Sequence, residues 1–294
     1  MSCIAVGNFD GVHRGHLKIM KMTSQIAKKE NTSAIALTFD TNTKRAFNSG
    51  FKYITDKDTK RELLLSSGID KVEFLEFTPE IMSMSGKDFI KMLISSYGMS
   101  HIVCGDNFRF GHRASCGIAE LKAMCDEEKI SCTIVAVDGI SSTAVRKAVS
   151  AGNIELANEL LGHDFCYKGK LVGGNRIGRT IGFPTLNSSV REDYLLPPNG
   201  VYATYCVSDG EAYPAVTNIG TRPTVTTVKE IFIETHLIGL DRIPEGKEDD
   251  FSDIRFLSRI RDEKIFPDTD ALAKQISADC EYSIKVFRDR VIRP

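Results

Sequence analysis

The sequence predicts an α/β chain of two domains, an N-terminal parallel sheet covered by helices and a C-terminal antiparallel β domain that closes with a helix. Three observations support this prediction. The first half alternates strand and helix signals, the second half has short strand signals with glycine turns and prolines, and 294 residues suggest about two domains. The boundary is expected near Gly162, which gives domains 1–162 and 163–294.

The N-terminal half has the element order of a parallel sheet. Strand signals lie at residues 4–6, 34–39, 72–77, 101–104 and 133–137. Helical stretches separate them, for example 57–66 before Gly68 and 87–97 before Gly98, where glycine is suited to end a helix. Strands that alternate with helices pair in parallel, and such sheets bind ligands beyond the carboxyl ends of their strands.

The C-terminal half has the pattern of an antiparallel barrel or sandwich. Strand candidates at 200–207 and 213–217 flank an Asp209-Gly210 turn, which favours a hairpin, and 231–238 and 254–257 are further candidates. A closing helix is expected from about residue 270 to residue 288, because apolar side chains recur there at helical spacing.

Composition and charge exclude several classes of protein. The chain has 38 Lys+Arg against 39 Asp+Glu, a net charge of −1, so nothing points to nucleic acid or to a membrane surface. No apolar run has the length of a membrane span and no cleavable signal peptide precedes the first motif, so we expect a cytoplasmic protein. Eight scattered cysteines without a Cys-x-x-Cys pair indicate reduced, mostly buried thiols.

The densest chemistry lies at the start of the chain. Gly7-Asn8-Phe9-Asp10-Gly11-Val12-His13-Arg14-Gly15-His16 follows the first strand and leads into a helix. Glycines let the backbone approach a ligand closely, and a helix start presents unpaired N–H groups to an anion. His13 and His16 are expected on one helical face. The pattern favours a nucleotide phosphate site; the alternative is a half-buried core histidine, since His16 lies on the apolar stripe of the helix.

Two later segments are expected to line the same crevice. Gly105-Asp106-Asn107-Phe108-Arg109-Phe110-Gly111 follows a strand and offers an amide and a guanidinium to a planar ligand, or else is an ordinary loop with its phenylalanines packed inward. Ile140-Ser141-Ser142-Thr143-Ala144-Val145-Arg146 begins a helix, where hydroxyls are usually N-caps. With Arg146 one turn in, this helix start would also hold a triphosphate or pyrophosphate.

A glycine-rich segment of the C-terminal half indicates a flap over phosphates. It contains Gly169-Lys170-Leu171-Val172-Gly173-Gly174 and then Gly178-Arg179-Thr180-Ile181-Gly182-Phe183-Pro184-Thr185-Leu186-Asn187, although barrels also use glycine at corners. Thr185 and Asn187 point the same way in an extended stretch, so their oxygens suit Mg²⁺ bound together with ATP phosphates. Glu234 interrupts an apolar strand, as a base accepting a proton from a substrate hydroxyl would.

These motifs together resemble the bacterial bifunctional riboflavin kinase/FAD synthetase family over nearly the full length. Residues 7–16, 105–111 and 141–146 are similar to the adenylyltransferase motifs of that family, and residues 178–187, 200–203, 218–224 and 234–237 to its kinase motifs, in the same order. The resemblance implies a Rossmann-like nucleotidyltransferase domain with a parallel sheet, followed by a riboflavin-kinase-like antiparallel β-barrel with a C-terminal helix.

The resemblance implies two transfers that each use ATP and Mg²⁺. The C-terminal domain would phosphorylate riboflavin to FMN, and the N-terminal domain would adenylylate FMN to FAD with a second ATP, releasing pyrophosphate. Riboflavin, FMN, FAD and ATP are then the expected ligands, with no nucleic acid or membrane partner, and self-association is left open. The alternatives are one working half, an adenylyltransferase for another phosphorylated alcohol, or a flavin-binding carrier or sensor without turnover.

The resemblance also implies roles for individual residues. The catalytic residues would be Glu234 in the kinase half and His13, His16 and Arg146 in the adenylylating half. ATP and its phosphates would be bound by Gly7, Phe9, Asp10, Gly11, Ser142, Thr143, Gly174, Gly178 and Arg179. The flavin would contact Asn107, Phe108 and Arg109, and Mg²⁺ would be held by Thr185 and Asn187.

Two places depart from the family pattern. Phe39-Asp40 is followed by Thr41-Asn42-Thr43 instead of a Pro-His pair, which bears on adenylylation. The usual Asp-Leu-Tyr-Gly stretch after Glu234 is replaced by residues 238–251, with an acidic loop at 245–250, which bears on the affinity for the flavin. The sequence therefore leaves open whether both halves are active.

Overall fold

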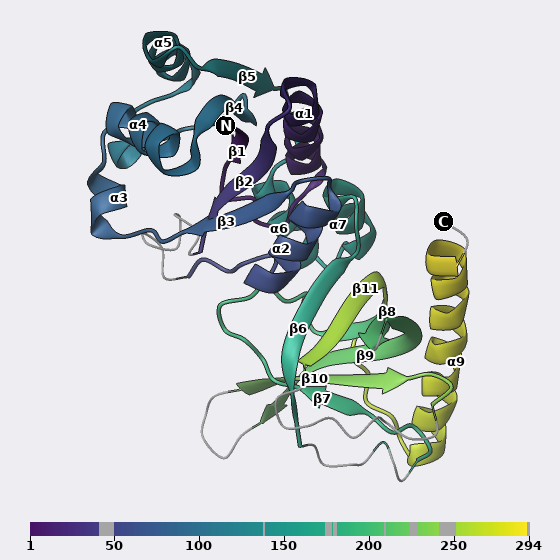
Figure 1. Ribbon diagram of the computed structural model, residues 1–294. Coiled ribbons are helices and arrows are strands. Elements are labelled where there is room, and N and C mark those ends of the chain that lie inside the picture. Colours follow the sequence, from purple (N-terminus) through teal and green to yellow (C-terminus); the bar gives the residue numbers. More distant parts are fainter. Residues whose placement is uncertain are drawn as a thin grey trace. The chain divides into compact units, whose positions relative to one another are not determined.

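The computed structural model describes residues 1–40, 50–137, 139–173, 178, 181–208, 210–223, 229–240 and 251–292. The chain forms two compact units, Met1–Ser142 and Thr143–Pro294, whose described parts are drawn in Figure 1. The domain boundary expected near Gly162 stays a prediction, because a functional domain need not end where a compact unit ends.

The first unit contains a five-stranded parallel sheet. Its strands are β1 Ser2–Val6, β2 Ser33–Phe39, β3 Lys71–Leu75, β4 Met99–Gly105 and β5 Ser131–Val135. Their order is β3-β2-β1-β4-β5. The pairing is parallel throughout, which confirms the predicted parallel sheet. The strand order reverses between β1 and β4, so the carboxyl ends of these two strands form the switch point at which open sheets bind ligands.

Helices cover both faces of this sheet, with α1 and α2 on one face and α4 and α5 on the other (Figure 1). The helical elements are α1 Arg14–Glu30, α2 Lys57–Ser66, α3 Pro79–Ser83, α4 Gly86–Tyr97, the short η1 His112–Ala114 and α5 Ile118–Glu128. Along β1, Cys3 and Ala5 pack in the cluster with α1, whereas Ile4 and Val6 pack in the cluster with α4. Burial on both faces explains why β1 is apolar throughout.

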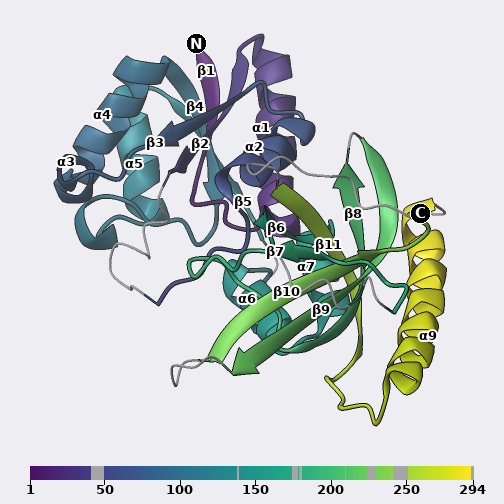
Figure 2. The same ribbon diagram turned by 90° about the horizontal axis from the view of Figure 1, so that it is seen from below.

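The second unit contains a closed antiparallel barrel, which settles the choice between barrel and sandwich (Figure 2). Its strands are β6 Phe165–Val172, β7 Leu186–Ser188, β8 Gly200–Ser208, β9 Glu211–Pro223, β10 Lys229–Leu237 and β11 Phe251–Arg261. Their order around the barrel is β10-β7-β6-β11-β8-β9. The hairpin predicted at Gly210 joins β8 to β9, with Ser208 paired to Glu211.

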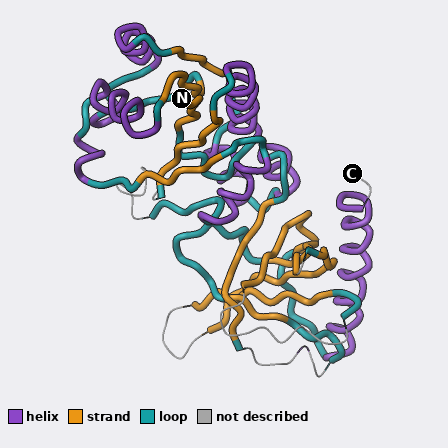
Figure 3. Tube along the Cα trace, in the orientation of Figure 1, coloured by secondary structure: helices purple, strands orange, loops and turns teal. Residues whose placement is uncertain are grey.

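The helical elements of this unit are α6 Ser142–Ser150, α7 Ile154–Leu161, α9 Thr269–Phe287, which is the predicted closing helix, and the final turn η2 Arg288–Ile292 (Figure 3). Two of them, α7 and α9, contact the barrel through buried polar groups. Asn158 of α7 donates to the Phe256 carbonyl at 2.8 Å and accepts from Phe165 N at 2.7 Å. Arg261 of β11 pairs with Asp279 of α9 at 2.8 Å, where the aspartate side chain is 2% exposed.

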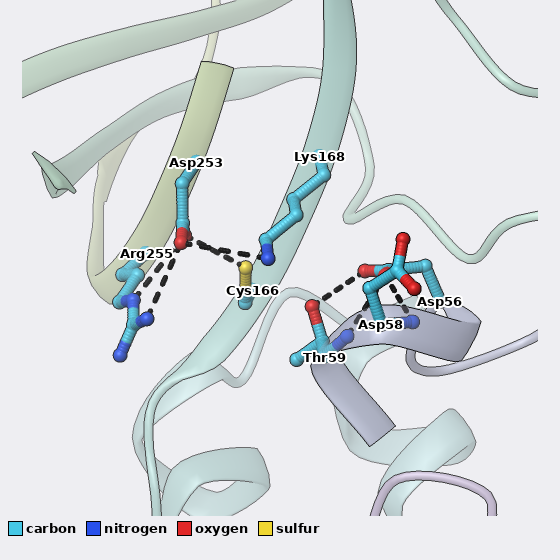
Figure 4. Close-up of polar contacts among 7 residues, drawn as sticks. All are labelled: Asp56, Asp58, Thr59, Cys166, Lys168, Asp253 and Arg255. Carbon is cyan, nitrogen blue, oxygen red and sulfur yellow. Dashed lines mark hydrogen bonds and ion pairs between the residues drawn. The ribbon is translucent and has the colours of Figure 1, made fainter. Parts of the chain in front are cut away.

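The cysteines are free thiols, as predicted, and seven of the eight are buried. Cys166 on β6 donates to Asp253 on β11 at 2.9 Å, and Arg255 donates to the same carboxylate at 3.2 Å (Figure 4). Burial, and then the charge of Asp253, raise the pKa of the Cys166 thiol well above its usual value. This cysteine therefore stays protonated and contributes a structural hydrogen bond between two barrel strands.

Candidate active sites

The turn that follows β1 has an uncommon backbone. Phe9 and Val12 have φ angles of 44° and 39°, and Gly11 has 81°. Positive φ is rare for a β-branched residue such as Val12, and strain of this kind persists where the surrounding structure enforces it, often at functional sites. Position 7 has no room for a side chain, because a Cβ there would lie 2.7 Å from the Phe9 ring.

Buried hydrogen bonds hold this turn from its inner side. Thr38 Oγ1 and Lys60 Nζ donate to the Asn8 carbonyl at 3.0 and 3.1 Å. Ile54 N donates to the Asp10 carboxylate at 3.1 Å, and the Asp10 residue is 1% exposed. Asp10 thus shapes the turn, and the phosphate-binding role expected for it stays a prediction.

The two histidines meet through a helix cap rather than along one helical face, which corrects the expectation from their spacing. His13 is the N-cap of α1, and its Nδ1 accepts from His16 N at 3.4 Å. The two rings stack, with centroids 3.6 Å apart and an interplanar angle of 19°. Gly15 makes room for the stack, because a Cβ there would lie 3.1 Å from the His13 ring.

His16 is held in its uncharged form. Burial, then the charges of His13 and Lys60, lower the pKa of His16 well below its ordinary value. Its Nδ1 is buried and has no hydrogen-bond partner in the described part of the chain. An unpartnered buried polar atom costs about 1–3 kcal/mol, so this arrangement favours a site that faces a ligand over a histidine that only packs.

A cavity of about 420 Å³ lies beside the carboxyl ends of β4 and β5. It is lined by Asp106, Asn107, Val137, Gly139, Ile140 and Ser141. Both later segments singled out in the sequence contribute to it, and the size suits a nucleotide or a flavin. Ser142, next in the chain, donates to the Asp10 carbonyl at 2.9 Å and so connects this wall to the glycine turn.

The remaining predicted residues of these segments are placed differently. Phe108 stacks on Phe110 with centroids 5.4 Å apart and packs against the apolar core, as the ordinary-loop alternative expected. Arg109 is exposed, with its guanidinium beside Gly117. Thr143 and Arg146 lie in α6, exposed and half-buried respectively. The ligand contacts expected of Phe108, Arg109, Thr143 and Arg146 stay predictions.

Lys60 is a component of the first site that sequence reasoning missed. It lies on α2, whose N-cap Asp56 is drawn in Figure 4, and is 3% exposed. Burial lowers the pKa of Lys60, while the carboxylates of Asp10 and Asp40 raise it. The signal in the sequence was its spacing of four residues from the buried Leu64, which places the lysine on the inner face of the helix.

The barrel brings three polar side chains of the second site together by strand register. Glu234 on β10 pairs with Asn187 on β7 and with Asn218 on β9. Directly opposed residues project from the same face of a sheet, with Cβ atoms roughly 5 Å apart. The neighbours Ile233 and Thr235 are 1% and 0% exposed and face the core, so Glu234 faces away from it.

Asn218 was not singled out in the sequence as a site residue. Its Oδ1 is buried and has no hydrogen-bond partner within the described residues. It lies opposite Glu234, so the two polar side chains project from the same face of the sheet. It begins the 218–224 segment that resembles a kinase motif, but its position opposite Glu234 follows only from the strand register.

The segment before β7 is fixed to β10. His236 Nδ1 donates to the Pro184 carbonyl at 2.8 Å, and its ring lies edge-on to Phe183 with centroids 5.3 Å apart. Phe183 N donates to the Gly178 carbonyl at 2.7 Å, and a Cβ at Gly178 would lie 3.4 Å from Thr185 Cγ2. These contacts fix the backbone on the N-terminal side of Thr185, and the hydroxyl of Thr185 and the amide oxygen of Asn187 are ligand types that fit Mg²⁺.

Several expected features lie outside the described residues. These are the phosphate-binding candidates Gly174 and Arg179, the Thr41-Asn42-Thr43 segment that replaces the Pro-His pair, and the acidic loop 245–250. Among the described side chains, no group of three or more His, Cys, Asp or Glu is arranged to hold a metal ion.

Comparison with known proteins decides the family. The FAD synthetase family matches residues 1–148, and the riboflavin kinase family matches residues 161–287. A bifunctional riboflavin kinase/FMN adenylyltransferase of Listeria monocytogenes is 32% identical over 284 residues, which cover 94% of this chain and 89% of the relative. The chain belongs to the bifunctional riboflavin kinase/FMN adenylyltransferase family.

Other relatives with the same name agree. The Bacillus subtilis protein is 33% identical over 298 residues, covering 97% of this chain and 92% of the relative. The Escherichia coli protein is 33% identical over 285 residues, covering 94% and 90%. Family membership thus extends over both halves of the chain.

A solved structure shares the fold. A Streptococcus pneumoniae chain described as a macrolide-efflux protein superposes with a TM-score of 0.86 at 27% identity, covering 96% of this chain and 93% of that chain. Among the helices that the structure describes in this chain, none combines the length and the apolar character needed to cross a membrane.

Proposed function

We propose that this chain is a bifunctional flavin-cofactor enzyme that phosphorylates riboflavin to FMN and adenylylates FMN to FAD, using one ATP in each step. The observation that carries the proposal is that both family matches coincide with a built site. The barrel sets Glu234 opposite Asn187 and Asn218, and the turn after β1 sets His13 against His16 beside the sheet switch point.

In the kinase step, Glu234 would accept the proton of the ribityl 5′-hydroxyl of riboflavin. The freed oxygen attacks the γ-phosphorus of ATP, the bond from that phosphorus to the β,γ-bridging oxygen breaks, and ADP leaves. Thr185 and Asn187 would hold Mg²⁺, which supplies charge neutralisation on the phosphates when bound. Phosphoryl transfer depends mostly on such alignment and electrostatics, which fits a site fixed by strand register.

In the adenylylation step, a phosphate oxygen of FMN attacks the α-phosphorus of ATP and pyrophosphate leaves. His13, His16 and Arg146 would stabilise the charge that develops on the phosphates, and the neutral ring of His16 can do so by donating a hydrogen bond. Ser142 and Thr143 at the start of α6 would hold phosphates, with Gly7, Phe9 and Gly11 bringing the backbone close.

The cavity between residues 106–107 and 139–141 is where we place a ligand of the adenylylation step, with Asn107 in its wall. Phe108 and Arg109 would then contact the flavin of FMN. The cytoplasmic location, the state of self-association and the Mg²⁺ requirement stay predictions from the sequence.

The proposal is tested by incubating the purified chain with riboflavin, ATP and Mg²⁺ and separating the flavins over time. We expect FMN first and FAD after it. Unchanged riboflavin contradicts the proposal, whereas FMN that accumulates without FAD supports the alternative of one working half. Flavin that binds but is never converted supports the carrier or sensor alternative.

A further inference from the structure

Lys60 is a buried charge to which the proposed reaction assigns no role. Lysine is rarely buried this fully without a partner or a function, and here the side chain is 3% exposed. Its Nζ donates to the Asn8 carbonyl at 3.1 Å, and Thr38 Oγ1 donates to the same oxygen at 3.0 Å. Two donors on one carbonyl fix the peptide between Asn8 and Phe9, next to the strained φ of 44° at Phe9.

Charged groups from three elements surround this ammonium. Burial has the largest effect and lowers the pKa of Lys60, whereas Asp10 of the glycine turn and Asp40 at the end of β2 raise it and Lys57, one turn earlier on α2, lowers it further. The two carboxylates make a buried cation tolerable at this position. The Lys60 side chain therefore lies directly behind a turn that we expect to face phosphates.

Lys60 also acts on the histidine pair. Two charged imidazole rings with centroids 3.6 Å apart would repel each other, so at most one of them carries the proton. The charged groups that act on His16 are His13 and Lys60, and both lower its pKa in addition to burial. Lys60 thus helps to make His16 the neutral member of the pair.

We propose that Lys60 is a positioning residue of the adenylylation site: its ammonium clamps the Asn8 carbonyl behind the glycine turn that leads to His13 and His16. The role rests on the proposed conversion of FMN to FAD. Lys60 touches neither substrate; it acts through the turn and through His16.

The test replaces Lys60 with Met, which keeps the length of the side chain and removes the charge. Lys57→Met is the matched control, because Lys57 is exposed and its Nζ lies over the same Phe74 ring, at 4.8 Å against 5.8 Å for Lys60. Conversion of supplied FMN to FAD is measured as kcat/KM across pH. Conversion of riboflavin to FMN by the same preparations reports whether the barrel is intact.

We expect Lys60→Met to lower kcat/KM for FAD formation roughly 100-fold, the cost of a displaced reactive group. Because the pKa of His16 rises when the nearby cation is removed, the acid limb of the pH profile moves to higher pH. Lys57→Met changes neither. Thr38→Val removes the other donor to Asn8 without removing charge, so it lowers the rate about tenfold, the loss expected for one buried hydrogen bond, and leaves the acid limb in place.

Titration of the His16 ring nitrogens by NMR gives a readout besides activity. In the unmodified chain His16 stays neutral well below the usual histidine range, and in Lys60→Met it protonates at higher pH. An unmoved acid limb together with an unmoved His16 titration in a folded Lys60→Met protein would overturn the role. If that variant does not fold, a His16 that titrates at the ordinary histidine value in the unmodified chain overturns it instead. Absence of FAD formation by the unmodified chain contradicts the proposed function, and the titration still tests Lys60.

Discussion

The two sites of this chain are positioned by different means. In the first unit, a turn with strained φ angles at Phe9 and Val12 is held by side-chain hydrogen bonds to Asn8 and Asp10 that come from distant segments. In the barrel, the backbone ladder itself sets Glu234 opposite its neighbours. A site fixed by a few buried side chains is sensitive to single substitutions around it, whereas a site fixed by strand register loses mainly the chemistry of the residue replaced.

The largest expected effect removes the proposed base of the kinase half. Glu234→Gln keeps the shape of the side chain and should lower FMN formation roughly 10²- to 10⁴-fold, the usual contribution of general-base catalysis. FAD formation from supplied FMN should not change. Glu211→Gln, at an exposed carboxylate on β9, is the control. Loss of FAD formation with intact FMN formation would reverse the assignment of Glu234.

A smaller effect is expected when the glycine turn is overfilled. A Cβ at position 7 would lie 2.7 Å from the Phe9 ring, so Gly7→Ala must displace that ring and the turn with it. We expect FAD formation to fall roughly 100-fold, because small misplacements of reactive groups have effects of that size. FMN formation, measured on the same preparation, serves as the control. An unchanged rate of FAD formation would show that the turn does not position the phosphates.

A still smaller effect is expected at the residues proposed for Mg²⁺. Asn187→Ala removes an oxygen opposite Glu234 and should raise the Mg²⁺ concentration needed for half-maximal FMN formation by about tenfold, the usual scale for weakening a metal site. The Mg²⁺ dependence of FAD formation should stay the same. Equal shifts in both reactions would place the effect of Asn187 outside the kinase site.

The smallest effect concerns the unpartnered acceptor of the barrel. Asn218→Leu removes a buried Oδ1 that has no partner among the described residues, so the free protein should unfold at the same temperature or higher. If a riboflavin hydroxyl donates a hydrogen bond to this Oδ1, the variant should have a KM for riboflavin about tenfold higher, the equivalent of one hydrogen bond of roughly 1.4 kcal/mol. A lower melting temperature with unchanged KM would mean that Asn218 only supports the fold.

The parts of the fold that follow local patterns could be predicted from the sequence. The strands β1 to β5 alternate with helices, two of which end shortly before Gly68 and Gly98, and the closing helix has a regular apolar face. The choice between barrel and sandwich depends on which strands meet to close the sheet, which local patterns leave undecided. The helix α5 was not singled out, since its N-cap Gly117 offers no side-chain acceptor.

The same division holds within the sites. His13, His16, Thr185, Asn187 and Glu234 could be found because they lie in compact motifs. Asn218 also lies in a quoted motif, 218–224, but its place opposite Glu234 follows only from the strand register. Lys60 lies in none of the quoted motifs, and it donates to a carbonyl 52 residues earlier. The spacing of the histidines correctly predicted that they lie close together. It did not predict that His13 is the N-cap of the helix that carries His16.

The central claim is that one chain carries out both transfers at separate sites. It is tested most directly by supplying riboflavin with ATP radiolabelled either at the γ-phosphorus or at the α-phosphorus and separating the flavins. We predict that the γ label appears in FMN and then in FAD, whereas the α label appears in FAD and never in FMN. Absence of the γ label from FMN, or of the α label from FAD, would contradict the claim.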